Sequence, residues 1–381
     1  MRVLHLIKSL GRGGAEMLLP EGLRFADRSR FEFRYAYFLP WKDALVPALV
    51  DQGAPVDCLA ASGNARILMS ARRVARYIRE HGIELVHCHL PVAGAVGRLA
   101  GRMTGVPVIY TEHNKQERYH PWTRALNRLT WRWQELVIAV SDDVANSIAQ
   151  HMGSHVPVEV VLNGVDLDRF RRDPAAGAAV REELGIEPDS PVVGTVAVFR
   201  AQKRLEDWLA AAARIRERLP DARFVLVGDG PLRSEIEARA RTRGLDDVVF
   251  FAGLREDVRP YLSAMDVYMM SSEFEGLPVA LLEAMSMECT PVCTAVGGIP
   301  QAVHDGRNGY LVPPRRPGDL AEGVIRVLAM PDLGRAMGAA ARDIVRQSFD
   351  MRAMARSLEG IYDRIARQPV DQRVPARQEA S

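Results

Sequence analysis

Short apolar runs rich in β-branched residues alternate along this chain with segments whose apolar residues recur at helical spacing. Strands are predicted at 3–7, 33–38, 85–89, 106–110, 136–140 and 158–162, with intervening helices such as 15–25, 67–79 and 142–152. The pattern restarts near residue 190, with strands at 192–198, 224–227, 248–251, 267–270 and 292–294 and helices near 204–218, 231–243, 257–264, 277–287 and 317–329. Because strands that alternate with helices form parallel sheets covered on both faces, we predict an α/β fold with two Rossmann-like domains.

The two series of elements also predict the domain organisation. Residues 1–168 and 190–345 are predicted to form one domain each, joined by a polar stretch near 166–190, and 381 residues suit two domains. A helix over 346–367 is expected to return to the N-terminal domain, and a disordered tail is expected over 368–381. Ligands bind such sheets at the carboxyl ends of the strands, so two facing domains would place their ligand loops across a cleft.

Composition and charge exclude several classes of protein. Hydrophobic residues make up 48% of the chain and charged residues 26%, which excludes disordered, collagen-like and coiled-coil chains. The net charge of +2 gives no argument for nucleic acid, and no nucleic acid partner is expected. Residues 1–165 nevertheless hold 20 basic and 15 acidic side chains, so the N-terminal half is expected to meet an anionic partner.

The cysteines and the lengths of the apolar runs indicate in which cellular compartment the protein is expected. None of the four cysteines lies in a CxxC or zinc-ligand spacing, which is typical of a reduced cytoplasmic protein. No apolar run approaches the roughly 20 residues that span a bilayer. The strand predicted over 3–7 is too short, and too soon followed by Lys8 and glycines, to be a signal peptide. A cytoplasmic location is therefore expected.

A glycine-rich loop, Gly11-Arg12-Gly13-Gly14, lies between the first predicted strand and the first helix. Glycines there let backbone amides approach a phosphate at the helix N-terminus, although a plain tight turn explains the loop equally well. The loop is not GxGxxG, and no acidic residue about 20 positions further on completes a dinucleotide fingerprint. The pattern therefore argues against an NAD-dependent oxidoreductase.

Two cations, Arg200 and Lys203, lie where a strand of the second series gives way to a helix. Only four of the 50 basic residues are lysines, so a lysine at this position is notable. Cations at a helix N-terminus oppose the helix dipole, and a bound anion would account for them. The alternative is a solvated start of a helix.

Two glutamates flank the start of a later helix, Glu275 in the loop and Glu283 within an apolar stretch. Helical rise places their carboxylates on the order of 9 Å apart, which suits two contacts to one extended polar ligand. An unpaired glutamate in apolar surroundings is costly, which favours a ligand over a chance surface pair.

Taken in order, these motifs resemble a retaining GT-B glycosyltransferase of family 4 (group 1) over roughly residues 1–365. The residues that carry the resemblance are Gly13-Gly14-Ala15-Glu16, Thr111-Glu112-His113, Asn163-Gly164-Val165-Asp166, Lys203, Gly228-Asp229-Gly230-Pro231, the Glu275 and Glu283 pair, and Gly297-Gly298-Ile299-Pro300. The resemblance implies two facing Rossmann-like domains with C-terminal helices, the first binding the acceptor and the second the nucleotide-sugar donor.

The resemblance implies roles at the matching positions of both domains. Gly13 and Gly14 would approach the donor diphosphate, which Lys203 would hold from the other side. His113 would lie beside the transferred sugar near the reacting centre, although a structural role for this histidine is an open alternative. His89, at the end of the strand over 85–89, is expected to face the cleft on the acceptor side.

The remaining implied contacts follow the last strands. Glu275 and the amides of Gly276 and Leu277 would hold the transferred sugar, and Glu283 would accept hydrogen bonds from the ribose hydroxyls. The family usually has arginine where this chain has Val198, and whether Arg200 replaces it is open. This departure leaves a non-catalytic sugar-nucleotide-binding scaffold as an alternative, beside a GT-B nucleotide-sugar epimerase.

The implied activity is transfer of a sugar, with retention, from a nucleotide-sugar to a glycan or lipid-linked acceptor in cell-surface polysaccharide or glycolipid synthesis. No cofactor or metal is expected, because Asp166-Leu167-Asp168 follows an Asn-Gly turn and is explained by turn chemistry. The helix over 67–79, and a second one with Arg124, Arg128 and Arg132 on one face, are basic and amphipathic. Such helices indicate peripheral contact with the inner face of an anionic membrane, or simply a solvated basic face.

Overall fold

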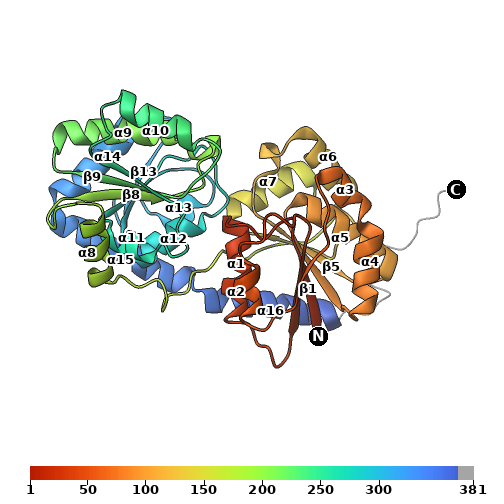
Figure 1. Ribbon diagram of the computed structural model, residues 1–381. Coiled ribbons are helices and arrows are strands. Elements are labelled where there is room, and N and C mark those ends of the chain that lie inside the picture. The colour runs from red at the N-terminus through yellow and green to blue at the C-terminus, as the bar shows by residue number, and fades with distance from the viewer. Residues whose placement is uncertain (368–381) are drawn as a thin grey trace. The chain divides into compact units, whose positions relative to one another are not determined.

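The computed structural model describes residues 1–367, and the chain divides into two compact units (Figure 1). One unit holds Met1–Asn163 and the chain from Met351 on, and the other holds Gly164–Asp350. Residues 164–189, expected in part as a linker, fold within the second unit and include helix α8 (Pro174–Glu183). The tail predicted over 368–381 lies outside the described residues.

The first unit is a parallel sheet with the strand order β3-β2-β1-β4-β5-β6-β7. Its strands are β1 (Arg2–Leu6), β2 (Glu32–Tyr37), β3 (Val56–Cys58), β4 (Leu85–His89), β5 (Val108–Glu112), β6 (Leu136–Ala139) and β7 (Val158–Val160). Its helices are α1 (Gly14–Leu23), α2 (Val46–Val50), α3 (Asn64–Met69), α4 (Ala71–Glu80), α5 (Pro91–Thr104), the 3₁₀ turn η1 (Gln116–Arg118), α6 (Pro121–Thr130), α7 (Asp142–Met152) and α16 (Met351–Arg367). The strand order reverses between β1 and β4, so loops from both directions meet at this point.

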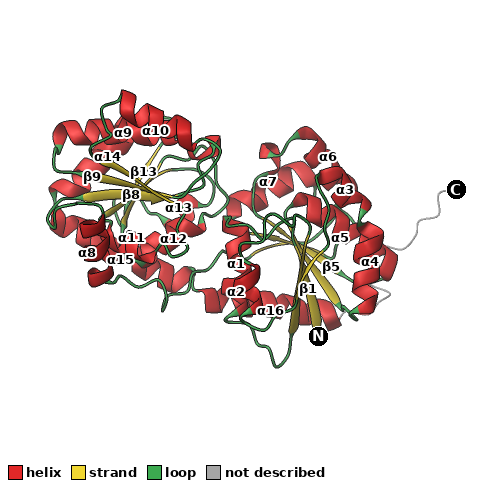
Figure 2. Ribbon diagram, in the orientation of Figure 1, coloured by secondary structure: helices red, strands yellow, loops and turns green. Residues whose placement is uncertain are grey.

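The second unit repeats this design of strands between helices (Figure 2). Its strand order is β10-β9-β8-β11-β12-β13. Its strands are β8 (Val192–Val196), β9 (Arg223–Val227), β10 (Val249–Gly253), β11 (Val267–Met270), β12 (Thr290–Thr294) and β13 (Tyr310–Val312). Its helices are α8, the 3₁₀ turn η2 (Ala201–Lys203), α9 (Leu205–Arg218), α10 (Arg233–Thr242), α11 (Arg259–Ala264), α12 (Val279–Ser286), α13 (Ile299–Ala302), α14 (Pro317–Ala329) and α15 (Pro331–Ser348). The prediction of two parallel, helix-covered sheets is thus confirmed.

The last helix of the chain belongs to the core of the first unit. Ile361, Tyr362 and Ile365 of α16 are buried with residues of the first sheet, and the ring of Tyr362 lies edge-on to Phe31. Helix α16 begins at Met351 rather than at 346. The helix before it ends because Phe349 leaves helical geometry, and its carbonyl accepts a hydrogen bond from the Val165 amide at 2.9 Å.

Two local features move element boundaries away from the predicted ones, and a third is as predicted. The helix predicted over 67–79 is divided into α3 and α4 at Ser70, whose hydroxyl donates to the carbonyl of Ile67. The strand predicted over 106–110 is β5, at Val108–Glu112, because Pro107 has no N–H to donate to the sheet. The predicted cap of α7 is present, since the Ser141 hydroxyl accepts from the Val144 amide. No helix among residues 1–367 is long and apolar enough to cross a membrane.

Candidate functional site

The loops after β8 and β11 in the second unit bring two predicted site residues into contact. Lys203 ends the 3₁₀ turn η2, and its Nζ lies 2.6 Å from Oε1 of Glu275. The Gln202 side-chain amide donates to the other carboxylate oxygen at 3.3 Å and to the Phe274 carbonyl at 2.8 Å. The Glu275 side chain is only 7% exposed, so the ammonium and amide donors supply the hydrogen bonds that a buried carboxylate requires.

Glycines hold both loops in place. A Cβ at Gly297, which has φ +60°, would lie 2.1 Å from the Glu275 carbonyl oxygen, and the Gly298 amide donates to the Gly276 carbonyl. A Cβ at Gly230 would lie 2.6 Å from the backbone N and O of Phe199, next to Arg200. The two glycine motifs therefore support the loops that carry the site residues. The sequence shows these glycines, but only the structure shows which loops they contact.

Leu277 and Glu283 complete the predicted donor contacts within this unit. Leu277 is buried at the end of the loop, directly before α12, and Glu283 lies on α12 with 8% of its surface exposed. Burial raises the pKa of the nearby Tyr268 phenol, and the charge of Glu283 adds to that rise. The loop that holds Glu275 and Gly276 thus leads directly into the helix that holds Glu283.

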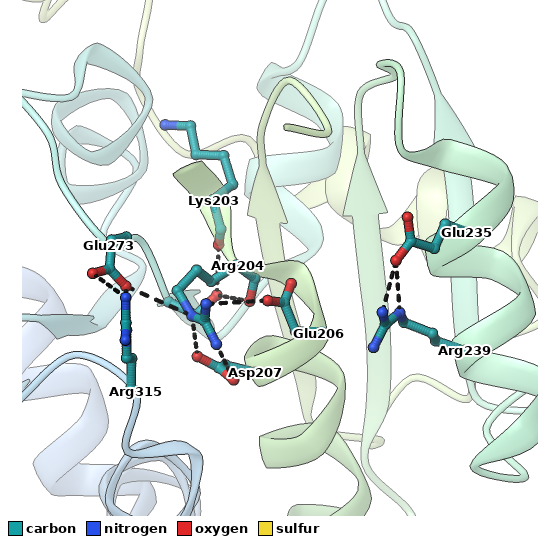
Figure 3. Close-up of polar contacts among 9 residues, drawn as sticks. Lys203, Arg204, Glu206, Asp207, Glu235, Arg239, Glu273 and Arg315 are labelled. Carbon is teal, nitrogen blue, oxygen red and sulfur yellow. Dashed lines mark hydrogen bonds and ion pairs between the residues drawn. The ribbon is translucent and has the colours of Figure 1, made fainter. Parts of the chain in front are cut away.

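The third basic side chain in this region, Arg204, is held by acidic neighbours (Figure 3). Its guanidinium is 2.6 Å from Asp207 and 3.3 Å from Glu206, and a further carboxylate, Glu273, lies 3.8 Å away. Lys203 points away from this cluster in Figure 3. Three carboxylates surround Arg204, whereas Lys203 pairs with Glu275 and Arg200 is exposed, so Lys203 and Arg200 are the better candidates for an anionic ligand.

In the first unit the glycine-rich loop caps α1. Gly13 is the N-cap and Gly14 the first helical residue, and a Cβ at Gly14 would meet nothing within 4 Å. Lys8 and Lys42 flank this loop, and burial together with the charge of Lys42 lowers the pKa of Lys8. Sequence reasoning noted the scarcity of lysine but did not place these two at the loop. The Glu16 carboxylate also lies at this helix start, where it accepts a hydrogen bond from the Ser9 hydroxyl, so the loop holds both signs of charge.

The structure also brings the two predicted histidines together. His89 ends β4 and His113 follows β5, and Nδ1 of His89 lies 3.4 Å from Nε2 of His113. The other nitrogen of His89 lies 3.0 Å from Nδ1 of His5. Burial lowers the pKa of His113 to about 4 and that of His5 to about 3, so both imidazoles are neutral at pH 7. Neutral imidazoles can donate or accept hydrogen bonds, but they offer no positive charge to a bound phosphate.

His5 and His87 were not singled out from the sequence. His87 is buried, with Nε2 at 2.7 Å from the Thr111 hydroxyl and Nδ1 at 2.8 Å from the Tyr362 hydroxyl. His5, His87 and His89 each offer a ring nitrogen, and the three nitrogens lie within 4.8 Å of one another. Within the described residues, this is the group with the geometry of a metal site.

Glu112 lies directly before His113 and is fully buried. Its carboxylate accepts hydrogen bonds from the hydroxyls of Tyr110 and Tyr119, the Gln116 side chain and the Asn114 amide. Burial raises the pKa of Glu112 to about 7 despite these donors. Three of the four donors come from the loop after His113, so the carboxylate organises that loop. The motif Thr-Glu-His marked the position, but only the structure shows these contacts.

Comparison with known proteins supports one family over both units. Residues 11–169 match the family described as Glycosyltransferase Family 4, and residues 178–344 match Glycosyl transferases group 1. The putative glycosyltransferase EpsF of Bacillus subtilis (strain 168) is 31% identical over 75% of this chain and 77% of its own length. The alpha-D-kanosaminyltransferase of Streptomyces kanamyceticus is 28% identical over 91% of this chain and 92% of its own.

Solved structures support the fold. The Anabaena protein HepE, crystallised with UDP-glucose, has a TM-score of 0.86 at 23% identity and covers 96% of this chain and 100% of its own. The sucrose-phosphate synthase of Thermosynechococcus elongatus has a TM-score of 0.80 at 21% identity, covering 96% and 99%. With a relative above 30% identity aligned over most of its length, the expectations of family, fold and enzyme class are confirmed: the chain belongs to the group 1, family 4 glycosyltransferases and has the GT-B fold.

Proposed function

We propose that this glycosyltransferase uses a nucleotide-sugar donor and binds its diphosphate and sugar with the loops after β8 and β11. The observation that carries the proposal is the partly buried ion pair of Lys203 and Glu275. We expect the first of these side chains to bind the diphosphate and the second the sugar. Two relatives carry donor names of this class, an Escherichia coli enzyme named for UDP-Gal and a Mycolicibacterium smegmatis enzyme named as GDP-mannose-dependent.

The ion pair suggests how a donor would be received. A diphosphate oxygen competes with Glu275 for Lys203, because both are anions that accept from the same ammonium. The carboxylate released in this way is then available to accept hydrogen bonds from sugar hydroxyls. Arg200 is exposed beside this loop and would add a second positive charge at the phosphates.

The proposed transfer proceeds with retention. The bond between the anomeric carbon and the diphosphate breaks, an acceptor hydroxyl attacks from the face that the diphosphate leaves, and its proton passes to the departing phosphate oxygen. Lys203 and the loop amides would stabilise the negative charge that develops on the leaving group. We infer that these fixed groups suffice and that donor binding needs no metal ion. His113 would lie beside the sugar as a neutral hydrogen-bonding group.

The acceptor is proposed to be a glycan or lipid-linked molecule of cell-surface polysaccharide or glycolipid synthesis, met at the inner face of the membrane. A groove of about 740 Å³ on the first unit supports an anionic acceptor, since four arginines line it: Arg66, Arg72, Arg73 and Arg76. Trp41 and Met69 line the same groove and are 60% and 74% exposed. Exposed apolar side chains among arginines suit the surface of an anionic membrane.

Helix α6 contributes less to such a surface than its sequence indicates. Trp122 and Leu129 are 80% and 73% exposed, but Trp131 is buried and Trp133 lies beneath the Arg102 guanidinium, 4.9 Å from its ring centre. Two of the three tryptophans near the basic face are therefore engaged within the unit.

The donor proposal is tested by thermal shift with UDP, GDP, ADP, dTDP and NAD⁺, each with and without EDTA. A nucleoside diphosphate at 100 times its Kd should add about 2.7 kcal/mol of stability, and EDTA should not reduce that shift. The same nucleotide should give a much smaller shift with Lys203→Ala and a full shift with Arg239→Ala, which breaks a surface ion pair on α10. A shift with NAD⁺ alone, or equal shifts in both variants, would contradict the proposed donor site.

The membrane proposal is tested by sedimentation with anionic and neutral vesicles at low salt. We expect the wild-type chain to sediment with anionic vesicles and the double variant Arg73→Ala, Arg76→Ala to sediment less. A matched pair of substitutions on the second unit, Arg239→Ala with Arg241→Ala, should leave sedimentation unchanged. No sedimentation of the wild-type chain would remove membrane contact and leave the donor proposal intact.

A further inference from the structure

We propose that His5, His87 and His89 bind one divalent transition-metal ion of the zinc class on the first unit's sheet. The proposal concerns a site apart from the donor loops and does not depend on which sugar is transferred. Three imidazoles with further side chains held around them are a common ligand set for zinc, copper, nickel and iron.

The strand register places the three ligands on one sheet face. His87 and His89 are two residues apart in β4, so their side chains project from the same face of the sheet. His5 of the neighbouring strand β1 is paired with His87, which brings its ring to the same place. The ring centres of His5 and His87 are 4.9 Å apart, and those of His87 and His89 are 4.3 Å apart.

The distances suit a shared ion. Zinc bound to imidazole nitrogens at about 2.0–2.1 Å in a tetrahedral arrangement places neighbouring nitrogens roughly 3.3 Å apart. Nδ1 of His5 and Nε2 of His89 are 3.0 Å apart, so small ring rotations admit an ion in place of the shared proton. One nitrogen of His87 lies within 4.8 Å of both and must approach further.

The second nitrogens of two ligands are already held, as they are in metal sites. Nδ1 of His89 lies 3.4 Å from His113, and whichever nitrogen of His87 binds, the other retains Thr111 or Tyr362 as a partner. Such outer contacts fix the orientation of a ligating ring and raise its basicity. The bond to His113 would connect the ion to a residue that we place beside the sugar.

The cavity around the histidines leaves room for the ion. A cavity of about 60 Å³ is lined by all three histidines, enough for an ion with one or two waters at about 30 Å³ each. Glu359 of α16 also lines this cavity, and its Oε1 accepts a hydrogen bond from the Asp27 amide at 2.6 Å.

The experiment measures metal directly, on the full chain without an affinity tag. The protein is stripped with a chelator, dialysed against Co²⁺, freed of excess metal, and analysed for cobalt content and visible absorption. We expect one cobalt per chain with the ligand-field spectrum of a tetrahedral site, and displacement of cobalt by Zn²⁺. No retained cobalt, or the weak spectrum of an octahedral surface ion, would overturn the proposal.

Variants locate the site. His89→Gln and His5→Gln should each weaken retention by at least about tenfold, whereas His155→Ala, at an exposed histidine of the same unit, should retain one cobalt. Circular dichroism identifies any variant that fails to fold, and in that case His87→Asn supplies the measurement. Equal retention in the ligand variants and the wild-type chain, or equal loss with His155→Ala, would show that the ion binds elsewhere.

Discussion

The two units share one design, but different interactions join the polar groups at their central strand ends, ion pairs in the second unit and hydrogen-bonded imidazoles in the first. In the second unit the loops after β8 and β11 are joined by full charges, the partly buried pair of Lys203 and Glu275 and the cluster around Arg204. In the first unit the corresponding ends hold neutral imidazoles, in hydrogen-bonded contact from His5 through His89 to His113. Two sheets of the same class can therefore carry different chemistry, because side chains on the loops and strand ends determine it rather than the fold.

The largest effect on sugar transfer is expected when a charged side chain of the Lys203–Glu275 pair is removed. Lys203→Ala should reduce kcat/KM for sugar transfer by about 1,000-fold, because a fixed positive charge at the leaving group is lost. Glu275→Ala should abolish most transfer as well, through loss of the sugar contact. Steady-state kinetics with the donor identified by thermal shift measure both, and Arg239→Ala serves as the control. Wild-type turnover in both variants would refute the site.

Adding a side chain at Gly297 should destabilise the second unit without removing any charged group. Gly297→Ala places a Cβ 2.1 Å from the Glu275 carbonyl at φ +60°, and we expect it to lower the free energy of unfolding by about 3 kcal/mol. Gly306→Ala is the matched control, since Gly306 has φ +71° but nothing within 4 Å of its Cβ. Denaturant unfolding compares the two variants. Equal losses would mean that backbone strain alone, and not support of the Glu275 loop, explains the glycine.

The first unit should respond to the ionisation of one buried carboxyl group. The folded-state pKa of Glu112, raised to about 7, lies above its ordinary value of 4.5, so the folded state binds the extra proton between these pH values. The stability contributed by this group is therefore fully present below pH 4.5 and is lost as pH rises to about 7. Relative to Glu112→Gln, the wild-type chain should lose up to about 3 kcal/mol over that interval.

Denaturant unfolding at pH 5, 6, 7 and 8 measures this difference. The variant keeps the size of the side chain and removes its titration, so the two curves should converge to nearly parallel between pH 7 and 8. A constant difference at every pH would show that Glu112 does not titrate in this range.

The smallest expected effect is a difference in stability between the two units at mildly acidic pH. Histidines whose pKa is lowered by burial stabilise the folded state above their ordinary value of 6.5, and this stability is lost as pH falls toward the folded values, about 3 for His5 and 4 for His113. Hydrogen exchange at pH 7.5 and 5.5 is measured in the Glu112→Gln background, which removes the opposing titration of Glu112, and is corrected for intrinsic rates. It should show at least about tenfold weaker protection in β1 and β4 at pH 5.5, with β8 and β11 less affected. Earlier opening of β8 and β11 would reverse the proposed contrast.

The sequence identifies single candidate site residues better than it predicts which residues come into contact. Gly13, Lys203 and Glu275 were identified because their residue types suit phosphate or sugar and their positions follow predicted strands. The break between α3 and α4 at Ser70 could not be predicted from periodicity, which continues through the break. The contact of Gly297 with the Glu275 carbonyl was missed for a different reason, because no local signal tells which distant loop a glycine must accommodate.

By itself the sequence determined the two parallel sheets and the order of their elements, because hydrophobic periodicity is a local property of the backbone. The tertiary structure alone decided that Lys203 meets Glu275 across 72 residues and that His87 meets Tyr362 across 275. The histidine cluster likewise depends on β1 lying beside β4, 80 residues later, at the reversal of strand order. Which strands become neighbours is set by long-range packing of the whole core, and no short segment carries that information.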